Sequence, residues 1–230
     1  MASREQELYE KIRPLLEGHT EGVYWDFKKS LSDTAEIIKD ILAFSNSPHD
    51  EDSYIIVGVS ESTSKRLHKI QLSTKDRQRL NAEANYLYLP GKWNVHGITK
   101  NDIEKMHEFS AKLMQKVTSS MLISQPFLEF IPIQIKVKRW LYVIIVKRVP
   151  GVFISNKDLY NEKGEKVVVK QGVLYVRNVD TTSGAGDGNI APAAEHIRIW
   201  KRYMDYLSAH LGSGESTRIM YPLDGGERND

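Results

Sequence analysis

The sequence has no cysteine among its 230 residues. This absence excludes disulfides, thiolate metal sites and cysteine nucleophiles, and it fits a reducing compartment. Long apolar runs are also missing, because the run at 140–146 is far too short to span a bilayer. The charged N-terminal residues lack the uninterrupted apolar stretch of an export signal. We therefore expect a cytoplasmic protein with no membrane contact.

A large excess of one charge is likewise absent, since 32 Lys and Arg residues face 30 Asp and Glu residues. The distribution is uneven, however. Residues 136–212 contain 13 basic and 7 acidic side chains, whereas residues 1–70 contain 9 and 13. Such a chain can present a basic face that attracts a polyanion. The alternative is that these charges are solvated strand edges and helix faces.

The spacing of apolar residues predicts a single α+β domain over residues 1–211. Expected helices cover residues 3–17, 33–46 and 99–121, and a last one begins at Pro192 and ends at Gly212. Expected strands cover residues 22–28, 54–59, 127–137, 140–148 and 167–177. We interpret residues 62–98 as an insertion and residues 212–230 as a disordered tail.

Four short motifs occur along this pattern of helices and strands. They are Glu21-x4-Asp26-Phe27-Lys28-x-Ser30, Ala43-Phe44-Ser45-Asn46, the strand at 54–59 that contains Gly58-Val59, and Gly172-Val-Leu-Tyr175-Val-Arg177. Together and in this order they resemble the Schlafen/AlbA-type domain, also called the divergent AAA-like ATP-binding domain. The resemblance implies a mixed β-sheet flanked by helices and a role in handling nucleic acid. Schlafen members cleave tRNA or rRNA with three carboxylates and a divalent metal, whereas many bacterial relatives are DNA-binding or ATP-binding regulators.

The resemblance assigns roles to individual residues. Glu21 and Asp26 match the first two carboxylates, Lys28 matches the adjacent lysine, and Arg177 matches the arginine of the late strand. The third carboxylate follows the Gly-Val pair in the nucleases, and Ser60 takes that place here. Glu61 is next, but a shift of one residue points a strand side chain to the other face unless a bulge intervenes. The implied Mg2+ or Mn2+ ligands are therefore Glu21, Asp26 and Glu61.

Phosphodiester cleavage needs an activated water and neutralisation of charge on phosphorus, and a divalent cation on carboxylates supplies both. Glu21 and Asp26 converge only if the chain bends before the strand, which Gly22 allows. We thus take Glu21, Asp26 and Lys28 as candidate catalytic residues. The alternative is that Asp26 and Lys28 form a solvated pair and that Glu21 lies in a loop.

Basic side chains are the candidates for phosphate contacts. They are Lys28, Lys29, Lys65, Arg66, Arg177 and the basic residues of 136–148, although Arg177 is equally suited to a structural ion pair. The sequence thus indicates a nucleic-acid-binding protein, with a metal-dependent endoribonuclease acting on structured RNA as its catalytic form. A non-catalytic DNA- or RNA-binding module and an ATP-binding accessory protein are the alternatives. RNA is favoured over DNA, and a homodimer or a partner protein stays open.

Overall fold

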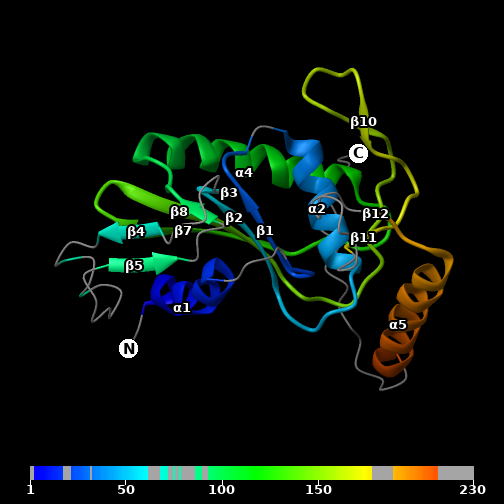
Figure 1. Cartoon of the computed structure of the whole chain (residues 1–230). Coiled ribbons are helices and arrows are strands. Elements are labelled where there is room, and N and C mark those ends of the chain that lie inside the picture. The colour runs from blue at the N-terminus through cyan, green and yellow to red at the C-terminus, as the bar shows by residue number, and fades with distance from the viewer. Residues whose placement is uncertain are drawn as a thin grey trace, which may run out of the picture.

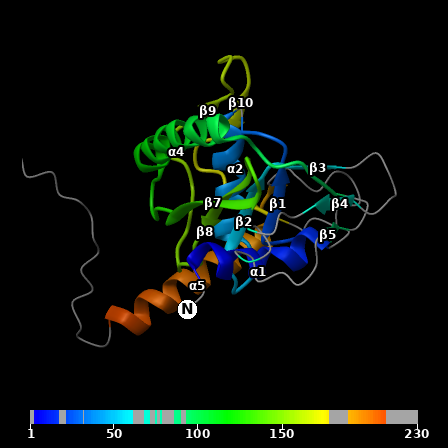
Figure 2. The same ribbon diagram turned by 90° about the vertical axis from the view of Figure 1, so that its left-hand side faces the viewer.

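The computed structural model describes residues 3–17, 22–31, 33–61, 68–71, 75, 78, 86–89, 93–177 and 189–211. Its body has three layers, with a β-sheet between two helices on one face and one helix on the other (Figure 2). The helices are α2 (Thr34–Asn46) and α4 (Lys100–Ser120) on the first face and α1 (Arg4–Glu17) on the second. The predicted fold class, an α+β fold with a mixed sheet flanked by helices, is confirmed.

The central sheet has four strands in the order β1-β2-β8-β7. They are β1 (Trp25–Lys28), β2 (Ser53–Val57), β7 (Leu128–Lys136) and β8 (Arg139–Val146). Strands β1 and β2 are parallel, whereas β2 with β8 and β7 with β8 are antiparallel. The parallel pair is connected through α2, as parallel strands require a crossover.

Strand β2 is buried at all five positions. Its near-continuous apolar sequence is therefore explained by cover on both faces. Ile55 packs in the core beneath α2 and α4, and Ile56 packs in the core beneath α1. The prediction of a doubly covered central strand at this place is confirmed.

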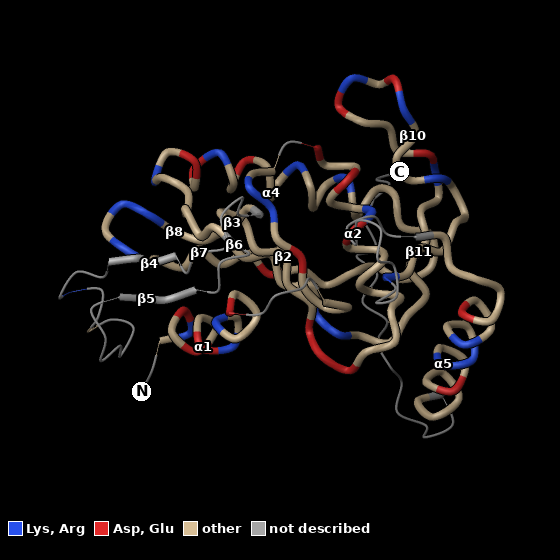
Figure 3. The backbone as a smooth tube through the Cα atoms, in the orientation of Figure 1, with Lys and Arg blue, Asp and Glu red and all other residues tan. Residues whose placement is uncertain are grey.

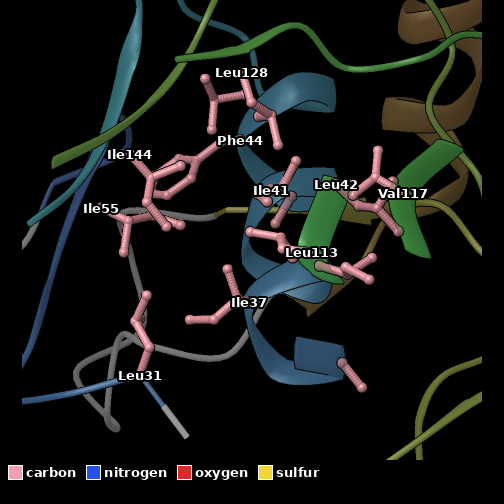
Figure 4. Packing of buried hydrophobic residues seen from close by; sticks show 14 of the residues in the cluster. Leu31, Ile37, Ile41, Leu42, Phe44, Ile55, Leu113, Val117, Leu128 and Ile144 are labelled. Atoms are coloured by element: carbon pink, nitrogen blue, oxygen red, sulfur yellow. The ribbon is translucent and has the colours of Figure 1, made fainter. Parts of the chain in front are cut away.

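The larger core lies between the sheet and helices α2 and α4 (Figure 4). Leu42 of α2 and Leu113 and Val117 of α4 are fully buried in it. Both helices start where the sequence predicts, each after a capping residue. Asp33 accepts a hydrogen bond from the Ala35 amide, and Thr99 forms a reciprocal capping box with Asp102.

Smaller elements surround the sheet (Figure 1). They are the pairs β3 (Val59–Glu61) with β6 (Trp93–Val95), β4 (His68–Gln71) with β5 (Tyr86–Leu89), β9 (Leu159–Tyr160) with β10 (Val167–Val169) and β11 (Tyr175–Val176) with β12 (Asn189–Ile190), and helix α5 (Ala193–Leu211). The single strand predicted at 167–177 is wrong. It is two short strands, because the chain turns between them at Gly172, whose φ is +71°.

The structure leaves the predicted insertion and the predicted disordered tail untested. Most of the expected insertion at 62–98 and all of the tail at 212–230 lie outside the described residues. Among the described helices, none is both long and apolar enough to cross a membrane.

Candidate functional site

Strand β1 divides its side chains between the two faces of the sheet. Phe27 packs in the core beneath α1, and Trp25 packs against the edge of that core. Asp26 and Lys28 alternate with Trp25 and Phe27 along the strand. Lys28 contacts both Asp26 and Asp40 of α2. The strand predicted at 22–28 is wrong at its start, because residues 23 and 24 form a turn and β1 begins at Trp25. Asp26 is only 1% exposed and is not part of a solvated pair.

Four charged side chains, Asp26, Lys28, Asp40 and Arg177, form the buried charge cluster of this protein. The Lys28 Nζ lies 2.8 Å from Asp26 Oδ2 and 2.9 Å from Asp40 Oδ2. The Arg177 Nη2 donates to Asp26 Oδ1 at 3.1 Å. Within the described part of the chain neither Oδ2 atom has a partner with hydrogen-bond geometry, so the contacts with Lys28 act as ion pairs. The cluster pairs two acidic with two basic groups.

Burial controls the electrostatics of this cluster. It raises the pKa of Asp40 to about 7, although the charge of Lys28 opposes the rise. Burial alone would lower the pKa of Lys28, but Asp40 and Asp26 outweigh it and raise that pKa. Lys28 therefore stays a cation, held between two carboxylates.

The end of helix α2 positions Arg177. The guanidinium of Arg177 lies over the Phe44 ring, 4.7 Å from its centroid. The Arg177 amide donates to Ser47 Oγ at 2.7 Å. Phe44 belongs to the Ala-Phe-Ser-Asn motif, and so two distant motifs meet here.

Asn46 joins α2 to two later segments. Its Nδ2 donates to the Phe153 carbonyl at 2.8 Å and to the Tyr175 carbonyl at 3.2 Å, and its Oδ1 accepts from the Phe153 amide at 3.1 Å. Asn46 is fully buried, so these bonds replace water completely. This clamp fixes the strand that precedes Arg177.

Gly58 ends β2 at the same edge of the sheet as Lys28. Its amide donates to the Lys28 carbonyl at 2.9 Å, and its φ is +101°. A β-carbon at Gly58 would lie 3.0 Å from the Cα of Gly97, so the site favours glycine. Beyond Gly58 the chain leaves the main sheet, and Ser60 pairs with Asn94 of β6.

The family comparison matches the Schlafen, AlbA_2 model over residues 21–185. The chain belongs to the Schlafen AlbA_2 family. No curated protein matches it. A solved structure with some likeness is the N-terminal domain of a DNA helicase RecG-related protein from Nitrosomonas europaea, with 15% identity. That match covers 80% of this chain and 98% of the other, and its TM-score of 0.34 supports no conclusion.

In this AlbA_2 domain the structure brings together only some of the predicted site residues. Asp26, Lys28 and Arg177 meet in the buried charge cluster, and Lys29 is exposed beside it in sequence. The side chain of Glu61 and the whole of Glu21, Lys65 and Arg66 lie outside the described residues. The chain does bend before β1, as Gly22 allows, because Gly22 bridges Trp25 in antiparallel fashion.

Sequence reasoning missed Asp40. The only signal is an acidic residue next to the apolar positions Ile37, Ile38 and Ile41 of α2. A carboxylate on the buried side of a helix needs a partner, which predicts a buried cation without saying which one.

The described side chains of the AlbA_2 domain do not by themselves form a site for a divalent cation. No group of three or more His, Cys, Asp or Glu side chains that could hold a metal occurs within the described ranges. The two oxygens of Asp26 face the cations of Arg177 and Lys28. Because the other two predicted ligands, Glu21 and Glu61, are not described, the Mg2+ or Mn2+ site stays a prediction.

The hairpin between β7 and β8 carries three of the five basic residues of 136–148 that were predicted as phosphate contacts, and the other two, Lys147 and Arg148, lie beyond the far end of β8. Lys136, Lys138 and Arg139 surround its tip, where Lys138 has a φ of 60° and Val137 is exposed. Figure 3 shows the resulting run of basic residues at the hairpin tip. Among the described residues, none of the three forms an ion pair.

Proposed function

We propose that this AlbA_2 domain binds nucleic acid along one edge of its central sheet. The edge is formed by the carboxyl ends of β1 and β2 and by the β7–β8 hairpin tip. The observation that carries the proposal is the group of three cations at that tip, Lys136, Lys138 and Arg139, none of which forms an ion pair within the described part of the chain. Cations that are not held in ion pairs are available to phosphates.

The register of the sheet puts these parts on the same side. Lys28 aligns with Val57, and Val57 aligns with Tyr142 near the start of β8. The exposed Lys29 therefore leaves β1 at the edge from which the hairpin projects. With about 4.8 Å between neighbouring strands, β1 and β7 are about 14 Å apart, enough for contacts to several successive phosphates.

We infer a binding module without nuclease activity. Ser60 occupies the place of the family's third carboxylate, and Asp26 is engaged by Lys28 and Arg177. A hydroxyl is a poorer ligand than a carboxylate for hard divalent cations, and a metal at Asp26 would have two cations as neighbours. The family's cleavage chemistry is the second candidate, and the same experiment tests it.

The test measures fluorescence anisotropy of a labelled tRNA and a labelled single-stranded DNA at several salt concentrations, in EDTA and in Mn2+. We expect a salt-sensitive complex in EDTA and intact nucleic acid in Mn2+. The triple variant K136Q/K138Q/R139Q should bind more weakly, and the slope of log affinity against log salt should decrease by about 2 to 3, because each phosphate contact contributes about 0.7 to 0.9.

The matched control is K163Q/K166Q/K170Q, which removes three exposed lysines around the β9–β10 pair. It changes net charge by the same amount, so it should leave the slope near the wild-type value. Equal weakening by both variants would refute the hairpin edge. If neither the tRNA nor the single-stranded DNA binds wild-type protein at low salt, the proposed nucleic-acid binding is refuted. Cleavage in Mn2+ that D26N abolishes would favour the nuclease.

A further inference from the structure

Arg202 of helix α5 has two buried donors without acceptors. Its Nε and Nη2 are inaccessible to water and have no hydrogen-bond partner among the described residues. Buried polar groups in folded proteins nearly always have a partner, which can be a protein group, a water or an ion. A charged group is the costliest one to leave in this state.

Two further arginines are close enough to Arg202 to repel it. Burial, and then the charges of Arg148 and Arg198, lower the pKa of Arg202. Burial likewise lowers the pKa of Arg148, with Arg198 adding to the effect. The pKa of His49 falls for the same two reasons, burial first and then the charge of Arg148. These three arginines form what we call the arginine cluster.

The acidic groups around the arginine cluster only partly offset its charge. Glu195, one turn earlier on α5, forms an ion pair with Arg198 and accepts hydrogen bonds from its Nε, at 2.8 Å, and its Nη2. Asp50 attracts Arg148 and Arg202, but it forms no ion pair with either among the described contacts. Asp52 also adjoins Arg148, but it forms an ion pair with Lys147. Three guanidinium groups against the two remaining carboxylates leave an excess of positive charge.

The fold holds Arg148 in place independently of any ligand. Its amide donates to Asp52 Oδ1 at 2.8 Å, and its Nη1 donates to the Ser45 carbonyl at 3.1 Å. That carbonyl belongs to the last turn of α2, where the helix dipole favours a cation. Arg148 is thus a fixed element, whereas the Arg202 side chain as a whole is only partly buried.

We propose that Arg148, Arg198 and Arg202 form a binding site for a phosphate group. Guanidinium groups match phosphate oxygens with paired, charge-assisted hydrogen bonds, and a dianion would neutralise the excess positive charge. The site adjoins Asp52 at the amino end of β2, the opposite edge from the hairpin tip. It therefore adds to the proposed function instead of restating it.

The experiment follows the arginine Nε–Hε resonances of the whole chain by NMR while pyrophosphate is added at constant ionic strength. We expect the Arg202 resonance to shift saturably, and R202M to reduce the affinity about 10- to 100-fold through loss of charge-assisted bonds. R202K should restore part of the affinity. K201M is the matched control, because Lys201 is the exposed neighbour on the same helix.

Further titrations with ATP, a single-stranded oligonucleotide and tRNA identify the source of the phosphate. Saturation by ATP with tighter binding than pyrophosphate assigns a nucleotide, and competition by the oligonucleotide or tRNA assigns a polymer backbone. No shift of Arg202 with any of the four ligands overturns the site. Equal loss of affinity in R202M and K201M also overturns it.

The two proposals fail separately. If pyrophosphate shifts Arg202 but neither nucleic acid binds at low salt, the phosphate site stands and the hairpin edge falls. If nucleic acid binds through the hairpin and Arg202 responds to no phosphate, the opposite holds.

Discussion

Lys28 on strand β1 and Asp40 on helix α2 are joined by an ion pair of 2.9 Å beneath the surface of the domain. The pair connects the first strand to the crossover helix that follows it. Because the pKa of Asp40 is raised to about 7, the stability of the domain depends on pH in a defined direction.

The first prediction concerns this pH dependence. An unfolded aspartate releases its proton near pH 4, whereas folded Asp40 holds it to about pH 7. The folded state binds the extra proton in this window, so the contribution of Asp40 is fully present below pH 4 and is lost as pH rises to 7. The limiting slope is about 1.4 kcal/mol per pH unit.

Urea unfolding at pH 4.5, 5.5, 6.5 and 7.5 checks it. D40N should flatten this part of the stability profile, while E104Q, at an exposed position of α4, should keep it. A D40N profile parallel to that of the wild type would show that Asp40 is not the source.

The second prediction concerns the buried pair of Arg177 and Asp26. Removing one partner leaves the other charge buried, so R177M and D26N should each cost about 3 to 5 kcal/mol in the free energy of unfolding. The double variant should cost clearly less than the sum of the two. Denaturant unfolding of the four proteins gives the coupling energy.

The exposed pair of Arg13 and Glu17, with Nε 2.9 Å from Oε1, is the matched control. Its coupling should stay below about 0.5 kcal/mol, because water screens exposed ion pairs. Additive effects for Arg177 and Asp26 would contradict the buried pair.

The third prediction concerns the Asn46 clamp. N46A removes three buried hydrogen bonds to the backbone of Phe153 and Tyr175. We expect a loss of about 2 to 4 kcal/mol in the free energy of unfolding. N101A, at an exposed position of α4, should change it by less than about 0.5 kcal/mol. Similar stabilities of the two variants would disprove the clamp.

The fourth prediction compares two glycines with positive φ. G164A adds a β-carbon that meets nothing within 4 Å, so it should cost about 1 kcal/mol of backbone strain. G58A also pushes against the backbone of Gly97, and its cost should be at least twice as large. Thermal or urea unfolding measures both, and equal costs would mean that the backbone at Gly97 moves away freely.

Local patterns predicted the elements of this fold well. Features that depend on residues within one turn or one strand could be predicted. They include the start of α4 at Thr99, the apolar strand β2 and the alternation of Asp26 with Phe27. The prediction of one strand at 167–177 failed because the chain turns at Gly172, although the residues around it are apolar.

The candidate site was harder to predict because its contacts are distant in sequence. Arg177 meets Asp26 across 151 residues, and nothing near either residue specifies the other. The family motifs located both residues, but not their pairing. Asp40 and Arg202 belong to no motif, and their partners become visible only in three dimensions.

The Asn46 clamp also sets a condition on synthesis of the chain. Phe153 follows Asn46 by 107 residues, so at 5 to 20 residues per second the ribosome adds it roughly 5 to 20 s later. Until then the Asn46 side chain at the end of α2 has none of its hydrogen-bond partners in Phe153 and Tyr175, so this end of the helix is only loosely ordered. We therefore expect chaperones and proteases to act on this protein mainly while only its N-terminal part has been synthesised.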